Sequence, residues 1–251
     1  MNPLLPFIMA GDPSLELLPQ MLSEAKALGL EAIELGLPHS DPIADGPVLQ
    51  AAAHRAIARG ATPRRVLESL AGLVDSPDVI LFTYLNPLFQ IGAGELRRLL
   101  APTPIKALLV VDLPFGEEPG FEAELRDAGY PMVPLLAPTT TLDRAAVLLA
   151  KRPDPGPPAP FAQRFAYVVA RLGVTGTGQD TDLVPVARRV AELKALTERP
   201  LAVGFGLSDP RSLALIRGMG ATPVIGSALV QELWNGQSLR ESLGSRVIGD
   251  G

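Results

Sequence analysis

Hydrophobic residues along the chain follow two alternating periods. Short apolar runs of strand length are each followed by a segment in which apolar residues recur at helical spacing. In the first helical segment the apolar residues that recur at helical spacing are Leu17, Leu18, Met21, Leu22, Ala25 and Leu28. The strands predicted in this way are Leu5–Gly11, Ala32–Leu37, Asp78–Tyr84, Ile105–Pro114, Pro131–Pro138, Phe165–Gly173, Pro200–Gly206 and Pro223–Ala228.

Turn and capping residues mark where the helices begin and end. Asp12 is predicted to be the N-cap of the first helix, with Pro13 in its first turn and Gly29 closing it. Histidine 54 falls on the surface of the next helix. The later helices are predicted at Val48–Arg59, Pro63–Val74, Glu95–Leu100, Glu118–Asp127, Leu142–Lys151, Leu183–Leu196, Pro210–Met219, Ala228–Leu233 and Leu239–Arg246.

This order of elements predicts an α/β protein with a parallel sheet. About eight strand–helix units fit the usual length of one (β/α)8 TIM barrel, so we expect residues 1–251 to form a single barrel domain. A doubly wound sheet would alternate in the same way, but the regular units show no break in composition. The Pro-rich stretch Arg152–Pro160 is predicted to be an exposed connection away from the site end of the barrel.

Composition narrows the range of functions. The formal net charge of −5 gives no indication of a nucleic-acid partner. No apolar run approaches the ~18 residues of a membrane span, and the N-terminus has no signal-peptide pattern. The chain has no cysteine, which excludes disulfides and thiolate chemistry, and its two histidines argue against a His-rich zinc site. We therefore expect a cytoplasmic protein without a metal centre.

Glycine-rich turns follow the last three predicted strands. Gly204, Gly206 and Gly226 would let backbone amides approach an anion, and Gly176 could add another. The helix that begins near Ser227 offers free N–H groups and a favourable dipole. In many TIM barrels this region binds phosphate, although each glycine alone could serve only its turn.

Glu34 is a carboxylate in the middle of the second strand. Alternation places Ala32, Glu34 and Gly36 on one face, so Glu34 is predicted to point into the barrel near its upper end. Burial would raise its pKa and suit it to proton exchange near neutral pH. Asp45 could supply a second carboxylate, although an Asp in such a loop also fits ordinary turn chemistry. His39 is predicted to be a solvated loop residue.

Carbon–carbon cleavage in such a barrel would have to run on carboxylates. A Schiff-base mechanism needs a lysine at the site, but Lys106, which is the one lysine in a predicted strand, lies at the wrong end. The substrate would then have to supply its own electron sink.

The segment "IELGLPHSDPIADGPVLQ" from Ile33 to Gln50 resembles the signature of the tryptophan synthase alpha subunit family. Further family segments occur in the same order over almost the whole chain. They are "GDP" at Gly11–Pro13, "VVDLP" at Val110–Pro114, "GVTGTG" at Gly173–Gly178, "GFG" at Gly204–Gly206 and "GSALV" at Gly226–Val230.

The resemblance implies a reaction and a set of site residues. The family cleaves indole-3-glycerol phosphate to indole and glyceraldehyde 3-phosphate without a metal or organic cofactor. It implies that Glu34 is the general acid and base and that Asp45 binds the indole N–H. It also implies substrate contacts from Phe7, Leu49, Tyr84, Tyr167, Thr175 and Phe205, and phosphate contacts from Gly176, Gly206, Gly226 and Ser227.

The resemblance further implies a partner, the beta subunit of tryptophan synthase, in an alpha2beta2 heterotetramer. Asp41, Pro42 and Pro114 are expected to contact it. This chain departs from the family in three places. Its first strand begins almost at Met1, where relatives have an extra helix; the Pro-rich stretch is longer; and His39 replaces an aromatic residue.

Two other functions remain open on the sequence. The glycine turns alone would also fit another phosphate-binding barrel enzyme, such as an isomerase or indole-glycerol phosphate synthase. The second alternative is a regulatory subunit that binds a partner and has no catalytic activity. The presence of both Glu34 and Asp45 argues against it.

Overall fold

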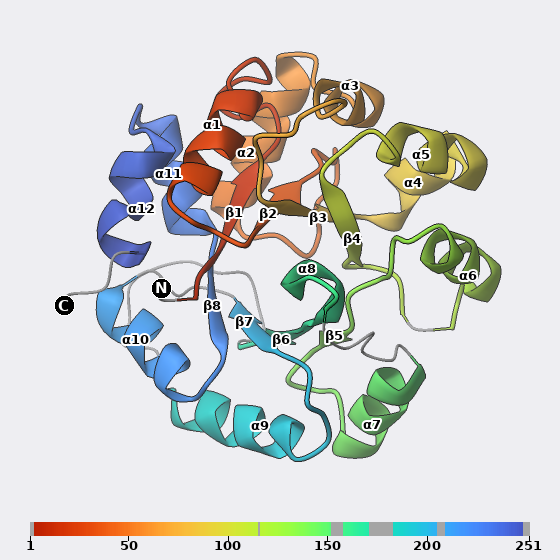
Figure 1. Cartoon of the computed structure of the whole chain (residues 1–251), viewed down its shortest axis with the longest axis vertical. Helices are drawn as coiled ribbons and strands as arrows, with labels where there is room; N and C mark the ends of the chain where they lie inside the picture. Colours follow the sequence, from red (N-terminus) through yellow and green to blue (C-terminus); the bar gives the residue numbers. More distant parts are fainter. Residues whose placement is uncertain (1–2, 115, 152–157, 171–182, 205–208, 248–251) are drawn as a thin grey trace.

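A computed structural model describes residues 3–114, 116–151, 158–170, 183–204 and 209–247. In these residues eight strands alternate with helices (Figure 1). The strands are β1 Leu5–Met9, β2 Ala32–Gly36, β3 Asp78–Thr83, β4 Ile105–Val110, β5 Leu135–Leu136, β6 Ala166–Val169, β7 Leu201–Gly204 and β8 Thr222–Ile225. The helices are α1 Leu18–Ala27, α2 Pro47–Ala58, α3 Pro63–Ser69, α4 Leu85–Ile91, α5 Ala93–Leu100, α6 Pro119–Asp127, α7 Leu142–Lys151, α8 Phe161–Arg164, α9 Val184–Lys194, α10 Pro210–Gly218, α11 Ser227–Trp234 and α12 Leu239–Val247.

The strands form one parallel sheet that closes on itself. Their order is β4-β3-β2-β1-β8-β7-β6-β5, with β1 paired to both β2 and β8. The two outer strands meet through a parallel bridge between Leu108 of β4 and Met132, just before β5. Leu108 donates its N–H to Pro131 O at 3.0 Å, and its own oxygen accepts from Val133 N at 2.8 Å. The predicted (β/α)8 barrel is therefore confirmed.

The core lies inside the barrel and between the barrel and its helices. Every residue of β1 and β2 is buried, as a strand covered on both faces requires. Side chains alternate between these two layers, so residues two apart share a face. The register aligns Phe7 of β1 with Glu34 of β2, and Glu34 with Ile80 of β3. This alternation directs one carboxylate into a layer that is otherwise apolar.

Two helices were missing from the prediction, and one cap was wrong. α4 begins directly after β3, and α8 follows the Pro-rich stretch. Asp12 does not cap α1, which begins six residues later at Leu18. Its carboxylate instead accepts two hydrogen bonds from Arg55 of α2, at 2.9 Å from Nε and 2.6 Å from Nη2. A tertiary ion pair has replaced the local cap.

The Asp12 ion pair ties the loop after β1 to two helices. The Arg55 guanidinium lies over the Trp234 ring of α11 at 4.0 Å from its centroid, and that of Arg59 lies at 5.0 Å. Asp12 is buried, whereas Arg55 keeps about a quarter of its side chain exposed (24%). Such an arrangement fixes the C-terminal end of α2 relative to the barrel.

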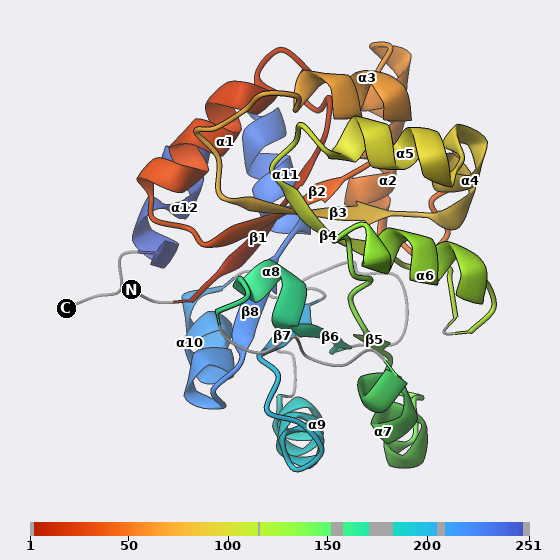
Figure 2. The same cartoon turned by 45° about the vertical axis from the view of Figure 1, so that its right-hand side comes forward.

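Helix α8 lies across the N-terminal end of the barrel. Figures 1 and 2 place it inside the ring of outer helices, and it contacts β3 and β4. Gln163 donates to Lys106 O and Gly129 O, each at 3.2 Å, and buried Arg199 donates to Arg164 O at 2.8 Å. A segment from the β5–β6 connection thus covers the floor of the barrel.

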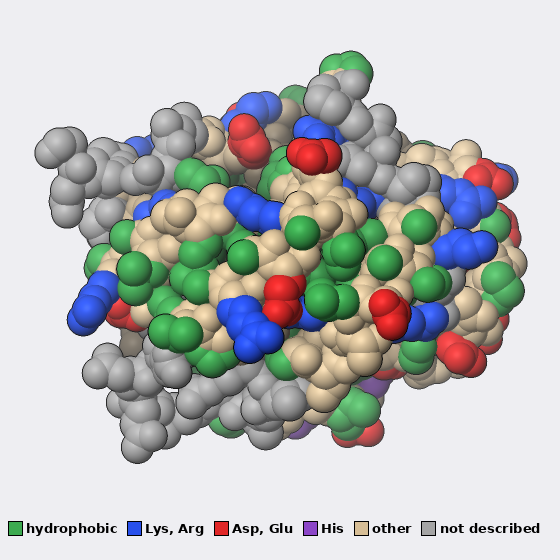
Figure 3. Space-filling view, turned by 90° about the horizontal axis from the view of Figure 1, so that it is seen from below, with side chains coloured by type: hydrophobic (Ala, Val, Ile, Leu, Met, Phe, Trp, Pro, Cys, Tyr) green, Lys and Arg blue, Asp and Glu red, His purple; other side chains and the backbone are tan. Residues whose placement is uncertain are grey.

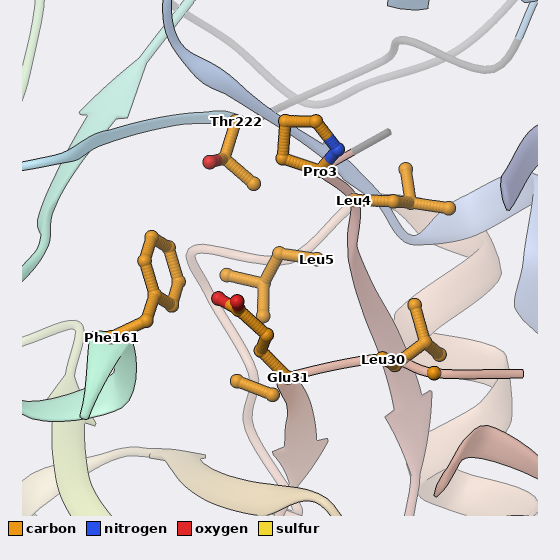
Figure 4. Close-up of a pocket in the computed structure, with 9 residues that line it drawn as sticks. Pro3, Leu4, Leu5, Leu30, Glu31, Phe161 and Thr222 are labelled. Carbon is orange, nitrogen blue, oxygen red and sulfur yellow. The ribbon is translucent and has the colours of Figure 1, made fainter. Parts of the chain in front are cut away.

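A hollow remains beside α8 at this floor. It holds about 480 Å³ of space, counted to its open mouth, and Phe161 faces Leu5, Glu31 and Thr222 across it (Figure 4). Phe161, Leu5 and Thr222 are the first residues of α8, β1 and β8, and Glu31 directly precedes β2. The hollow is therefore at the end of the barrel opposite the carboxyl ends of the strands.

The outer surface mixes apolar and charged side chains. The face that carries α7, α9 and α10 shows hydrophobic side chains among Lys, Arg, Asp and Glu (Figure 3). Val147 of α7, Val184 of α9 and Leu215 of α10 are among the exposed ones. In the described part of the chain, no helix has the length and hydrophobicity needed to cross a membrane.

Asp12→Ala should lower the free energy of unfolding by about 2 to 3 kcal/mol, because two charge-assisted hydrogen bonds to a buried carboxylate are lost. Urea unfolding measures the change. Arg188→Ala is the control: it removes an exposed pair with Glu192 on the surface of α9, and should cost about 0.5 kcal/mol or less. A loss for Asp12→Ala no larger than the control would contradict the structural role of the pair.

Candidate active site

A pocket opens at the carboxyl ends of the strands. It encloses about 430 Å³ of space, counted to its mouth. Its walls come from the five strands β1, β2, β3, β6 and β8, from the loop after β2 and from the starts of α2 and α11. The lining residues are Phe7, Glu34, Asp45, Gly46, Leu49, Phe82, Tyr167, Val224, Gly226 and Ser227. Seven of the sequence-predicted site residues therefore line this one pocket, namely Phe7, Glu34, Asp45, Leu49, Tyr167, Gly226 and Ser227.

Glu34 lies at the bottom of this pocket. Its exposed fraction is 1%, and burial raises the pKa of its carboxyl to about 8. Among the described residues, none lies within hydrogen-bond distance of its Oε1 atom. A buried carboxyl with an open oxygen favours its protonated form at neutral pH, since nothing there stabilises the charge.

Asp45 is the second carboxyl of the pocket. Burial raises its pKa to about 6, and the hydroxyl of Tyr84 opposes that rise by donating to Oδ2 at 3.3 Å. Its Oδ1 atom is buried, and no described residue bonds to it. Gln50 of α2 holds the main chain by donating from Nε2 to Asp45 O at 2.9 Å. One carboxylate oxygen is thus held by the protein and the other is open to the pocket.

Two glycines make room for the aromatic rings of the pocket. A Cβ at Gly36 would overlap the Phe7 ring, and a Cβ at Gly204 would overlap the Tyr167 hydroxyl. Tyr167 is fully buried, and burial together with the charge of Glu34 raises the pKa of its phenol. The sequence had suggested an anion role for Gly204. The structure gives the absence of a side chain there a steric reason, the close approach of Tyr167.

The N-terminus of α11 reaches the pocket at Gly226 and Ser227. Gly226 is the residue before the helix, and no side chain caps it, so the first amides of α11 lie open. A Cβ at Gly226 would meet the Phe7 ring only at ordinary contact distance, 3.7 Å. The predicted site residues Thr175, Gly176, Phe205 and Gly206 lie outside the described residues.

The loop between β2 and α2, residues 37–46, carries Asp41 and Asp45 and is called the acidic loop. It packs around the side chain of Tyr84. His39 stacks on the Tyr84 ring with centroids 4.6 Å apart, and its Nδ1 accepts the N–H of Asp41 at 3.0 Å. His39 is a partly exposed loop residue, close to the prediction, and in addition it packs on Tyr84 and holds the Asp41 turn. The Tyr84 hydroxyl accepts the N–H of Ala44 at 3.0 Å. His54 is exposed on α2 as predicted, with Nε2 at 3.3 Å from the oxygen of Ser40.

The three residues predicted to meet a partner differ in exposure. Asp41 and Pro114 are exposed, whereas the side chain of Pro42 is buried and offers no surface in this conformation. Ile43, next to it, is 73% exposed. This residue was missed by the sequence analysis, although an isoleucine inside a Pro- and Asp-rich loop was a visible signal.

Phe82 is a second residue that sequence reasoning missed. It lines the pocket and packs edge-on against Phe7, with ring centroids 5.2 Å apart. Alternation could have found it, because Glu34 aligns with Ile80 and Phe82 follows two residues later on the same face.

The fold and the pocket define a class: a TIM-barrel protein with two buried carboxyl groups at the carboxyl ends of its strands. Residues 1–247 match the family model described as tryptophan synthase alpha chain. A tryptophan synthase alpha chain from Prochlorococcus marinus (strain MIT 9313) is 41% identical over 233 residues, which cover 92% of this chain and 81% of the relative. One from Synechococcus sp. (strain CC9902) is likewise 41% identical over 234 residues, 92% of this chain and 82% of the relative.

Solved structures of tryptophan synthase are similar to this chain over nearly its whole length. A mutant tryptophan synthase alpha-subunit from Pyrococcus furiosus superposes with a TM-score of 0.79 at 28% identity, covering 97% of this chain and 98% of that one. A chain of tryptophan synthase from M. tuberculosis gives 0.80 at 25% identity, covering 97% and 91%. The chain belongs to the tryptophan synthase alpha chain family. This decides between the alternatives that the sequence left open.

Glu34→Gln should stabilise the fold more at high pH than at low pH. The folded-state pKa of about 8 lies above the ordinary value of 4.5, so the folded form keeps its proton longer than the unfolded form does. Stability is therefore lost as the pH rises from 4.5 to 8, and the variant escapes that loss.

Urea unfolding of wild type and variant near the two ends of this range measures the difference. Exposed Glu124→Gln on α6 is the control and should show no such pH dependence. A difference between Glu34→Gln and wild type that is the same at both pH values would show that Glu34 ionises normally in the fold.

Proposed function

We propose that Glu34 and Asp45 are the catalytic carboxyl groups of the reaction of this family. Tryptophan synthase alpha chains are lyases, and this chain cleaves indole-3-glycerol phosphate in tryptophan biosynthesis. The products are indole and glyceraldehyde 3-phosphate. The observation that carries the proposal is the buried carboxyl of Glu34, which faces the pocket with one oxygen open.

In the proposed mechanism, Glu34 acts first as an acid and then as a base. It donates its proton to C3 of the indole ring, and the ring nitrogen delocalises the positive charge. The bond between C3 and the glycerol carbon then breaks, and its electrons restore the aromatic ring. The Glu34 carboxylate takes the proton from the hydroxyl of that carbon, which becomes the aldehyde. The proton count balances, and Glu34 returns to its starting state.

The two pKa values support separate roles. With a pKa of about 8, Glu34 holds a proton at neutral pH and can donate it. With a pKa of about 6, Asp45 is mostly ionised there and can accept the indole N–H on its open Oδ1 atom. Its negative charge would stabilise the positive ring after protonation at C3. The indole itself then supplies the electron sink that a Schiff base would otherwise provide.

The remaining pocket residues are proposed to bind the substrate. Phe7, Leu49 and Tyr167 line the space beside the carboxyl groups, where the indole and glycerol parts would lie. Tyr84 does not line the pocket directly, and its hydroxyl reaches the site through Asp45. Thr175 and Phe205 complete the proposed substrate contacts. The phosphate is proposed to bind amides at Gly176, Gly206, Gly226 and Ser227, the last two at the open start of α11.

The partner is the beta subunit of tryptophan synthase, with which alpha chains pair. We propose an alpha2beta2 heterotetramer in which the exposed loop residues Asp41 and Pro114 contact that subunit, with Pro42 shaping the loop from inside. These loops lie at the pocket end of the barrel, so a partner there could receive indole directly. We also propose that residues 1–251 act as one domain. We propose that the chain works in the cytoplasm, because the charged phosphate group of the substrate would keep the substrate from crossing a membrane.

Glu34→Gln should lower the rate of indole release by about 10³- to 10⁴-fold, because the amide keeps the shape of the group and cannot exchange the proton in either step. An indole-release assay with purified chain, with and without beta subunit, measures the loss. Glu124→Gln on the surface of α6 is the matched control and should keep full activity. A Glu34→Gln rate above about one tenth of wild type would refute the assignment.

Gly226→Val should weaken phosphate binding more than it harms the fold, because the branched side chain would stand before the open amides of α11. Calorimetry with glycerol 3-phosphate measures the affinity, and a thermal melt monitors the fold. Gly94→Val on α5 has open space around the new side chain and serves as control. Unchanged affinity in Gly226→Val would remove this helix start from the phosphate site.

A further inference from the structure

We propose that His39 is a positioning residue for the reaction: its ring holds Tyr84 against Asp45, while its Nδ1 atom holds the exposed Asp41 turn. The His39 side chain thereby links Asp45, on the pocket side of the acidic loop, to Asp41, on its solvent-exposed side. The inference rests on the proposed function, because it assigns to Asp45 the indole N–H. It concerns a position in the signature segment at which this chain carries an imidazole, an aromatic ring that can also accept a hydrogen bond.

The side chain of Tyr84 contacts three residues of the acidic loop, His39, Ala44 and Asp45. Its exposed fraction is 3%, although it stands at the mouth of the barrel after β3. Its hydroxyl accepts the N–H of Ala44 at 3.0 Å and donates to Asp45 Oδ2 at 3.3 Å. A hydroxyl has one proton, which Tyr84 donates to Asp45, while an oxygen lone pair accepts the N–H of Ala44. The orientation of the phenol therefore decides which Asp45 oxygen is left for a ligand.

His39 covers the ring of this phenol. The two rings lie 4.6 Å apart with an interplanar angle of 29°, which is an offset stack. His39 is partly exposed and Tyr84 is not, so the imidazole is the layer between the phenol and water. With the stack on its face and two hydrogen bonds at its tip, the Tyr84 ring has no free rotation left.

The imidazole has a second, independent interaction. Its Nδ1 accepts the backbone N–H of Asp41 at 3.0 Å, and a backbone N–H can only donate. The ring is therefore neutral at Nδ1, with its proton on Nε2. This bond closes a short turn from residue 39 to residue 41 and fixes the backbone that presents the exposed Asp41 side chain.

The other side of the loop is held by α2. Gln50 donates from Nε2 to Asp45 O at 2.9 Å and to Pro42 O at 3.4 Å, and His54 lies at 3.3 Å from Ser40 O. The Asp45 main chain is thus anchored without His39. What His39 adds is control of the Asp45 side chain through Tyr84, together with the shape of the turn at Asp41.

Two substitutions separate the two interactions of His39. His39→Phe keeps a ring that can stack on Tyr84 and loses the acceptor for Asp41 N–H. His39→Asn keeps an acceptor for the N–H two residues later, as Asn does in Asx-turns, and loses the ring. His39→Ala loses both, and Tyr84→Phe keeps the stack but loses the hydroxyl. Thermal melts compare the folds of all four variants.

The ring is tested on the isolated chain. The kcat/KM for indole-3-glycerol phosphate should fall by about 3- to 10-fold in His39→Ala and in His39→Asn, the loss expected for one misplaced hydrogen bond. His39→Phe should rescue most of that loss. A second readout needs no substrate: carboxyl ¹³C titration should show the pKa of Asp45 raised in His39→Ala and in Tyr84→Phe, since the phenol hydroxyl lowers it.

The acceptor is tested with the beta subunit present. The factor by which that subunit increases kcat/KM should be smaller in His39→Phe and His39→Ala, and should be kept in His39→Asn. The inference is overturned if His39→Phe and His39→Asn behave alike in both assays, or if the Asp45 pKa is the same in wild type and His39→Ala. If Glu34→Gln keeps its activity, the proposed catalytic roles fail. The titration of the Asp45 carboxyl in the His39 variants would then still test whether His39 positions Asp45 through Tyr84.

Discussion

The structure depends on one unfavourable burial, that of the Glu34 carboxyl inside an apolar barrel. No local rule of strand formation asks for a Glu at that position, and an ionised carboxylate there would be costly to desolvate. The fold tolerates the group because it can stay protonated, as its pKa of about 8 indicates. The rest of the pocket is arranged around this fact. Phe7, Phe82 and Tyr167 keep water away, and Gly36 and Gly204 give those rings their space. Burial of the Glu34 carboxyl lowers the stability of the fold locally, and it places a proton donor in the pocket at neutral pH.

Periodicity was sufficient to predict the barrel and the inward direction of Glu34. The alternation of apolar residues in β2 and the order of elements needed no tertiary information. Local rules failed where a distant residue competed with them. Asp12 has the sequence of a helix cap, yet Arg55 lies 43 positions later in the chain and takes its carboxylate. At Gly204 the sequence suggested only an anion turn, and the structure adds a steric reason for a glycine, the phenol of Tyr167 on the neighbouring strand. Such partners become visible only when the strands are side by side.

The site itself was predicted in part, for a similar reason. The two carboxyl groups and the open start of α11 follow from positions at strand ends. The arrangement of the acidic loop does not, because it depends on a ring stack between His39 and Tyr84, which come from different strand–helix units. A loop rich in Pro, Asp and Gly indicates turns, and it does not indicate what the turns enclose. Here they enclose a phenol that orients a carboxylate.

The floor of the barrel has a consequence for how the chain folds during synthesis. β1 to β4 belong to the first half of the sequence, whereas α8, which covers the start of β3 and β4, begins only at Phe161. Arg199, later still, holds the end of α8 by its carbonyl groups. A nascent half-barrel leaving the ribosome would therefore carry four paired strands with their lower ends open to water. The first half therefore completes the burial of its lower end only after residues of the second half have been made.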